Sequence, residues 1–202
     1  MILTPNEAEK ELKIAEEKNP GAWIGHSESV GKNAGLIAER IEHMNRDAAY
    51  AMGLLHDIGR REGFKSILHT LDGYNYMTSL GQKEIARICL THSFPQKDIN
   101  TFLGKFDCTM EEKAFIADYL QKTEYDDYDR LIQLCDAISL PEGACIMEKR
   151  LLDVAMRHGV PDFTIDKWKA FLNLKKYFDG LCGCNIYDLL PNVVENSFRD
   201  LV

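Results

Sequence analysis

Apolar residues recur along most of the chain at intervals of three and four, the spacing of one face of an α-helix. Alternating apolar and polar runs, which predict half-buried strands, are rare. The pattern predicts ten helices, at residues 5–18, 21–44, 46–58, 71–80, 82–92, 110–122, 126–139, 143–158, 164–180 and 186–199. The predicted fold class is therefore all-α.

Glycine and proline mark the breaks between these predicted helices. The breaks fall at Asn19-Pro20-Gly21, Gly59 to Gly63, Pro95, Pro141 and Gly159-Val160-Pro161. The last of them separates a predicted helical core at residues 1–160 from a helical C-terminal extension at residues 161–202. We expect the extension to pack on the core.

Composition limits the classes of protein that fit. Of 202 residues, 45% are hydrophobic and 28% are charged, which suits a globular domain with a real core. No apolar stretch is long enough for a membrane helix, and the polar N-terminus lacks a signal-peptide pattern, so a cytoplasmic protein is expected. The net charge of −8 argues against extended nucleic acid and anionic membranes as partners. A homodimer is left open.

Helical phasing separates buried from exposed histidines. On the first long predicted helix, Ile37 and Met44 lie within about 20° of His26, so His26 belongs to the apolar face. His43 lies on another side of the same helix, near Glu39, and is expected to be a solvated histidine beside a carboxylate one turn away.

Polar residues also stand where burial is expected. His56 and Asp57 end the apolar run AAYAMGLLHDIG, and Asp136 lies at the edge of an apolar helix face. A buried charge without a partner is costly, so these side chains need one. His92 ends the helix predicted at residues 82–92, on its apolar face, while His69 is expected in a loop before a helix.

A metal site is one way to satisfy this set. Each histidine alone is more simply explained as a hydrogen-bonded residue, and a lone Asp136 as a salt-bridge or capping residue. His158, which precedes a glycine, is most simply a cation at a helix C-terminus. Together, buried imidazoles and carboxylates suit a divalent ion, with Fe, Mn, Ni, Zn and Mg as candidates. Coordination would also neutralise the buried carboxylates.

The order of these residues resembles the H…HD…D signature of the HD superfamily of metal-dependent phosphohydrolases. The resemblance covers about residues 20–140 and rests on His26 in WIGHSESV, His56-Asp57 in GLLHDIGR and Asp136 in LIQLCDAIS. It implies an HD-domain helical bundle in which these four residues bind one metal ion.

The resemblance also raises a second ion. Some branches of the superfamily add two histidines between the doublet and the last aspartate, and the aspartate of the doublet bridges both ions. His69 and His92 stand in the order that this would need, with Asp57 as the bridge. His92 stands alone, however, where some two-metal branches carry a pair of histidines. The expected cofactor is therefore one or two divalent ions.

The resemblance implies hydrolysis of a phosphate ester or anhydride. We expect a small phosphorylated substrate, such as a nucleotide, attacked by metal-activated water. Asp57 and Arg60 are the expected catalytic residues, and Arg60, Arg61 and Lys65 the expected phosphate-binding residues. A solvated charge in a polar loop is an equally good explanation for Arg60.

Two alternatives remain open at this point. A few HD relatives use the same six-ligand set for a di-iron centre that activates O₂ and oxidises an organic substrate, and ligand chemistry does not separate the two reactions. A non-catalytic HD module that senses a nucleotide is the third candidate. It ranks last because the residues expected to bind the first metal are all present.

Overall fold

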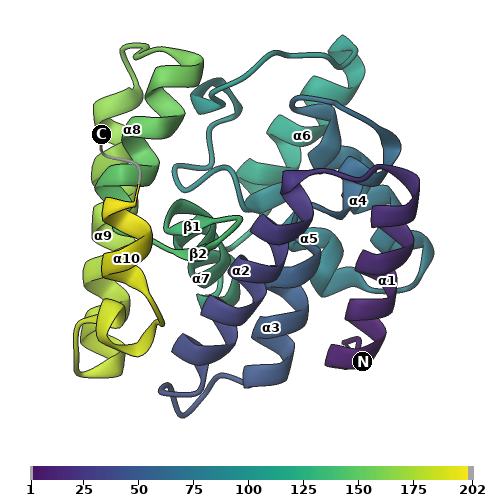
Figure 1. Ribbon diagram of the computed structural model, residues 1–202. Coiled ribbons are helices and arrows are strands. Elements are labelled where there is room, and N and C mark those ends of the chain that lie inside the picture. The colour runs from purple at the N-terminus through teal and green to yellow at the C-terminus, as the bar shows by residue number, and fades with distance from the viewer. Residues whose placement is uncertain (1, 200–202) are drawn as a thin grey trace.

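The computed structural model describes residues 2–199, and it is helical almost throughout (Figure 1). The α-helices are α1 (Pro5–Lys18), α2 (Ala22–Ala38), α3 (Arg46–Leu55), α4 (Leu68–Ser79), α5 (Lys83–Thr91), α6 (Met110–Lys122), α7 (Asp127–Ala137), α8 (Met147–His158), α9 (Thr164–Cys182) and α10 (Val193–Phe198). Short 3₁₀ helices are η1 (Ile58–Glu62), η2 (Ile99–Thr101) and η3 (Ile186–Leu189). A small antiparallel hairpin joins β1 (Ser139–Leu140) to β2 (Gly143–Ala144). The predicted all-α class is confirmed.

Helices α2 and α3 form the centre of the bundle and pack against each other along their length. Two glycines face each other where they cross: a Cβ on Gly53 would lie 2.9 Å from Gly31 Cα. Because neither residue carries a side chain, the two backbones approach closely. This approach brings the end of α3 beside the start of α2, where His56 and His26 lie.

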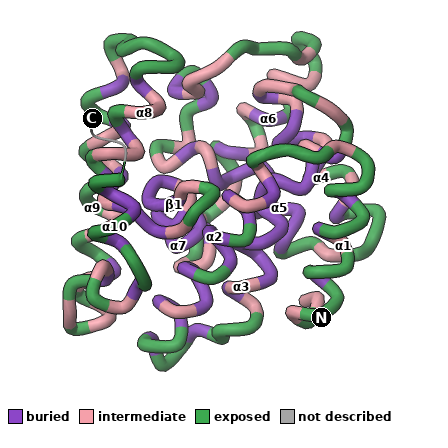
Figure 2. Tube along the Cα trace, viewed as in Figure 1, coloured by how far each residue is buried: buried purple, intermediate pink, exposed green. Residues whose placement is uncertain are grey.

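The hydrophobic core has two parts. The larger one lies among α1, α2, α3, α5, α7 and the C-terminal helices, and Figure 2 shows this buried centre under a more exposed periphery. The smaller one lies among α4, α5, α6 and η2 and includes the fully buried Phe94. The two parts flank the loops that follow α3 and α5, where polar side chains are buried.

The C-terminal helices α8, α9 and α10 lie together along one side of the molecule (Figure 1). Phe171 and Phe178 of α9 and Val193 of α10 are part of the larger core. The Asn196 amide also donates a 2.9 Å hydrogen bond to the carbonyl oxygen of Ala144 in the hairpin. The described part of residues 161–202 is thus packed on the rest of the chain through shared apolar and polar contacts.

Several predicted helix boundaries are wrong for identifiable reasons. Helix α2 ends at Ala38, and turns replace its predicted last residues. The helix predicted from residue 143 begins at Met147, because the hairpin takes the preceding residues. The last predicted helix is split into η3 and α10 by Pro191, which has no N–H to continue a helical ladder. Among residues 2–199, no helix combines the length and apolar character that a membrane crossing requires.

Helix α4 begins three residues before its predicted start. The Asp107 carboxylate accepts hydrogen bonds from the backbone N–H of Ser66, at 2.6 Å, and of Leu68, at 3.0 Å. A distant side chain therefore satisfies N–H groups that the first turn leaves unpaired. As a result His69 lies in the first turn of a helix rather than in a loop, which corrects the expectation.

Candidate metal centre

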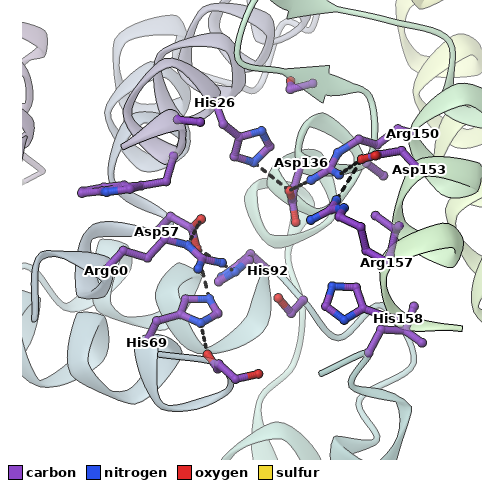
Figure 3. A pocket seen from close by; sticks show the side chains of 18 of the residues that line it. His26, Asp57, Arg60, His69, His92, Asp136, Arg150, Asp153, Arg157 and His158 are labelled. Carbon is purple, nitrogen blue, oxygen red and sulfur yellow. Dashed lines mark hydrogen bonds and ion pairs between the residues drawn. The ribbon is translucent and has the colours of Figure 1, made fainter. Parts of the chain in front are cut away.

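Six histidine and aspartate side chains meet where the ends of several helices converge, and Figure 3 labels all of them except His56. They are His26 of α2, His56 and Asp57 after α3, His69 of α4, His92 after α5 and Asp136 of α7. All are buried except Asp136, which is half-buried. The residues predicted to bind metal are therefore brought together by the fold.

The residues expected to bind the first ion lie close to one another. One ligand-type atom each from His26, His56 and Asp57 lies within 4.8 Å of the other two. Asp136 Oδ1 lies 3.0 Å from His26 Nε2, and His56 Nε2 lies 3.8 Å from Asp57 Oδ2. One ligand-type atom each from Asp136, His56 and His92 also lies within 4.8 Å of the other two.

The residues expected to bind the second ion form an adjoining group. Asp57 Oδ1 lies 3.1 Å from His69 Nε2 and 3.5 Å from His92 Nε2. Asp57 belongs to both groups and so occupies the position that a bridging carboxylate needs. Gly59 permits this arrangement, because a Cβ there would lie 2.0 Å from the carbonyl oxygen of His69. The glycine of HDIG thus lets α4 approach the doublet.

The histidine rings are oriented by the backbone. His56 Nδ1 lies 2.7 Å from the carbonyl oxygen of Gly53, and His92 Nδ1 lies 3.2 Å from that of Ile88. His69 Nδ1 likewise contacts the carbonyl oxygen three residues before it. Because a carbonyl only accepts, each Nδ1 carries a proton, and in the neutral form of each ring Nε2 presents a lone pair to the cluster. Metal-binding histidines in proteins are usually held in this way.

This arrangement leaves buried acceptors without donors. His56 Nε2, Asp57 Oδ1 and His69 Nε2 have no hydrogen-bond partner among the described residues. His69 Nε2 and Asp57 Oδ1 face each other at 3.1 Å, and in the neutral ring with the proton on Nδ1 both are acceptors. Two lone pairs at that distance repel each other unless a cation lies between them. The residues present therefore fit a divalent metal ion.

The protonation states also suit metal binding. Burial lowers the pKa of His56, and it lowers the pKa of His92 to about 3, so both are neutral at physiological pH. Burial raises the pKa of the Asp57 carboxyl, but the neighbouring Arg60 guanidinium opposes burial, and that pKa lies well below its usual value. For Asp136 the hydrogen bond from His26 likewise outweighs burial and lowers the pKa. Neutral imidazoles and ionised carboxylates are the forms that bind metals.

A family model for the HD domain matches residues 23–140, which is more than half of the chain. The chain belongs to the HD domain family. HD domains bind divalent metals, and most of the family are metal-dependent hydrolases. The match includes all six residues of the cluster and ends before α8. No curated protein and no solved structure matches the chain significantly.

A cavity of about 710 Å³ opens beside the HD cluster, which is the set of six residues named above, and all of them except His56 line it. Arg60 and Lys65, two predicted phosphate-binding residues, line it. Arg60 Nε donates to Asp57 Oδ2 at 2.5 Å, and Lys65 Nζ lies 2.7 Å from Asp72 Oδ2. Arg60 therefore has two roles open to it, because a guanidinium that binds Asp57 still has N–H donors for a ligand.

Arg61 is placed elsewhere. Its guanidinium stacks over the Tyr76 ring, 3.7 Å from the ring centroid, and lies 3.9 Å from Glu11 Oε2. It is buried between α1 and α4 and is not among the residues that line the cavity. This placement gives Arg61 a packing role and does not support its predicted contact with phosphate.

Sequence reasoning missed the other wall of the cavity. Arg150, Arg157 and His158 of α8, with Lys167 and Trp168 of α9, line it. These residues lie in amphipathic helices whose spacing shows which face is apolar but not which element that face will meet. His158 does end a helix, as predicted, but it also borders the cavity (Figure 3).

His43 lies outside the site, as the phasing predicted. Its side chain is 59% exposed and its Nε2 lies 2.7 Å from Asp127 Oδ2 of α7. The expected partner was Glu39, which instead faces Arg46 at 3.4 Å. Helix α2 ends before His43, so the predicted one-turn spacing no longer applies.

Proposed function

We propose that this HD protein is a metal-dependent phosphohydrolase that acts on a nucleotide or a related small phosphoester or anhydride. The observation that carries the proposal is the buried pair of acceptors, His69 Nε2 and Asp57 Oδ1, facing each other at 3.1 Å with no donor between them. Such a pair is costly in a protein interior unless a cation is bound. The first ion is assigned to His26, His56, Asp57 and Asp136, and the second to Asp57, His69 and His92.

The protein side chains divide the work of the reaction. When bound, divalent ions of this kind supply hydroxide at neutral pH and polarise the phosphoryl oxygen. Asp57 holds the two halves of the cluster together. Arg60, fixed by its hydrogen bond to Asp57, is placed to donate to a phosphate oxygen at the edge of the cluster.

The cavity supports a small substrate rather than a polymer. Its volume of about 710 Å³ lies within the roughly 300–1,000 Å³ common for small-molecule sites. Trp23 and Trp168 line it and offer flat apolar surfaces on which a nucleobase can stack. The net charge of −8 disfavours the extended phosphate backbone of a nucleic acid.

Metal analysis combined with a substrate panel tests this proposal. Protein purified without added metal is analysed for bound elements, then assayed for phosphate release from nucleoside mono-, di- and triphosphates with Mn²⁺, Ni²⁺, Zn²⁺, Fe²⁺ or Mg²⁺. Metal-dependent phosphate release that EDTA abolishes is the expected result. Two irons per chain with O₂ consumption and no phosphate release would indicate the oxygenase instead. Nucleotide binding without turnover under every condition would indicate a sensing module.

A further inference from the structure

Helix α8 places a second cluster of charged side chains in the wall of the cavity, outside the matched HD segment. The cluster consists of Arg150, Asp153, Arg157 and His158 and is shown in Figure 3. Arg150 Nη1 lies 3.1 Å and Arg157 Nη2 lies 2.9 Å from the same oxygen, Asp153 Oδ2. The single carboxylate therefore holds two guanidinium groups side by side.

Arg150 connects this cluster to the metal centre. Its Nη2 lies 4.0 Å from Asp136 Oδ1, while its Nη1 faces Asp153. Its Nε is buried and has no hydrogen-bond partner among residues 2–199. Arg150 also lines the cavity, so a ligand oxygen there can accept from the N–H donors at the end of its guanidinium.

The charges of this wall do not cancel. Two arginines share one aspartate, and Lys167 lines the same cavity. Among residues 2–199, the Lys167 ammonium donates to the carbonyl oxygens of Ser93 and Thr101 and to no carboxylate. Burial and the two neighbouring arginines lower the pKa of His158, which reflects the excess of positive charge. Arg150, Arg157 and Lys167 against Asp153 leave an excess of two positive charges in this wall, of which Asp136, 4.0 Å from Arg150, offsets one when it binds no metal ion. An anionic group such as a phosphate matches this excess.

We propose that Arg150, Arg157 and His158 form a subsite that receives a second phosphate group of the substrate while the first lies at the metal centre. The protein then prefers phosphoesters with two separated phosphates over those with one. This inference rests on the proposed phosphohydrolase function, because the first phosphate is assigned to the HD cluster. The apolar side chains of Leu151, Val154 and Trp168 in the same wall suit the organic skeleton between the two phosphates.

Phosphonates test the subsite without turnover, because their C–P bonds are not the ester bonds that a phosphohydrolase cleaves. Propylphosphonate carries one anionic group, and α,ω-alkane bisphosphonates with two to six methylenes carry two at increasing separation. Isothermal titration of the metal-containing protein gives a Kd for each. We expect the best bisphosphonate to bind at least about 10-fold more tightly than propylphosphonate, as one further charge-assisted contact allows.

Variants assign that preference to the arginines. Arg157→Gln, and Arg150→Gln combined with it, are expected to reduce the preference to less than about 3-fold. Arg157 is half exposed, so its replacement is expected to leave the fold intact. Arg130→Gln is the matched control. Arg130 Nη1 lies 3.1 Å from Asp127 Oδ1, three residues away in the chain, just as Arg150 Nη1 lies 3.1 Å from Asp153 Oδ2. Arg130, however, does not line the cavity. This control is expected to keep the wild-type preference.

The outcomes separate this inference from the proposed function. Three outcomes would overturn the subsite. The wild type could bind mono- and bisphosphonates equally, it could bind neither, or the preference for bisphosphonates could survive in the double variant. Phosphate release from nucleotides is measured in parallel on the same preparations. An arginine-dependent preference for bisphosphonates without phosphate release would support the subsite and reject the hydrolase. Phosphate release without that preference would support the hydrolase and reject the subsite.

Discussion

At the scale of single residues, Asp57 is the side chain on which the HD cluster depends most, because it faces histidines of both metal groups. Asp57→Ala removes the shared carboxylate and leaves Arg60 without its partner. We expect bound metal to be lost and metal-dependent phosphate release to fall by more than about 100-fold, beyond the 10–100-fold typical of residues that only support a ligand. Elemental analysis and a phosphate assay measure the two effects.

His43→Ala provides the comparison for that variant. His43 is exposed, and Asp127 is its one hydrogen-bonding partner among the described residues. Its loss is expected to leave metal content and phosphate release within about 2-fold of the wild type, since an exposed pair contributes little. Equal losses in the two variants would contradict the assignment of Asp57 to the centre and of His43 to the surface.

The second ion is tested at His69. His69 Nε2 faces Asp57 Oδ1 at 3.1 Å and has no other partner in the described chain. His69→Ala is expected to lower the metal content from two ions per chain to one and to reduce phosphate release, because a two-metal site holds both attacking and leaving oxygens. One ion per chain in wild type and variant alike, with full activity, would leave a one-metal mechanism.

Residue by residue, the site was predictable where local pattern decides burial. Helical phasing placed His26 inside and His43 outside, and the apolar run before His56 predicted its burial. The contacts of Arg61 and the partner of His43 were not predictable, because they come from elements far away in the chain. Spacing on one helix says which side chains share a face, but not what that face meets.

At the scale of elements, the start of α4 is a feature on which the HD cluster depends. The Asp107 carboxylate caps this helix and so places His69 in its first turn. Asp107→Ala is expected to lower the free energy of unfolding by about 1–2 kcal/mol, as loss of a cap does, and also to weaken binding of the second ion. Urea unfolding and metal titration measure the two effects.

Thr109→Ala is the matched change for Asp107→Ala. Thr109 caps α6 through a hydrogen bond from the backbone N–H of Glu112, and it does not touch the metal centre. It is expected to cost a similar amount of stability with no change in metal affinity. If both variants weaken metal binding alike, the effect comes from general destabilisation rather than from the position of His69.

Elements with local capping signals were predicted best. Helices α1 and α6 match their predicted bounds, and each starts with a capping box, formed by Thr4 with Glu7 and by Thr109 with Glu112. The start of α4 was missed because its cap comes from a residue almost forty positions later. The hairpin before α8 was missed because strands of two residues are too short to show a period.

At the scale of the whole molecule, the C-terminal helices complete the cavity that the HD segment only begins. The HD cluster lies within residues 23–140, whereas α8 and α9 supply Arg150, Arg157 and Lys167 to the other wall of the cavity. The sequence indicated that these helices exist. The packing that turns them toward the HD cluster involves the larger core, in which Phe171 and Phe178 of α9 meet residues of the HD segment. Tertiary packing of this kind leaves no local signal.

Lys167 shows the energetic consequence of that packing. Burial lowers its pKa to about 8, from 10.5 for an ordinary lysine, and the field of Asp136 only partly opposes this. Between about pH 8 and 10.5 the unfolded chain holds a proton that the folded protein has lost. The unfolded state therefore binds more protons, and the contribution of Lys167 to stability rises with pH across this window. Below it, the buried ammonium is a net cost.

Lys167→Met isolates this effect, because the other groups that titrate at high pH are present in both proteins and cancel in the comparison. The free energy of unfolding of the wild type minus that of Lys167→Met is expected to increase by about 2 kcal/mol from pH 7 to pH 10. Urea unfolding at half-unit steps of pH measures it. A difference independent of pH would mean that Lys167 keeps an ordinary pKa in the folded protein. A difference that falls would mean that the cavity stabilises the ammonium, as an acidic wall rather than a cationic one would do.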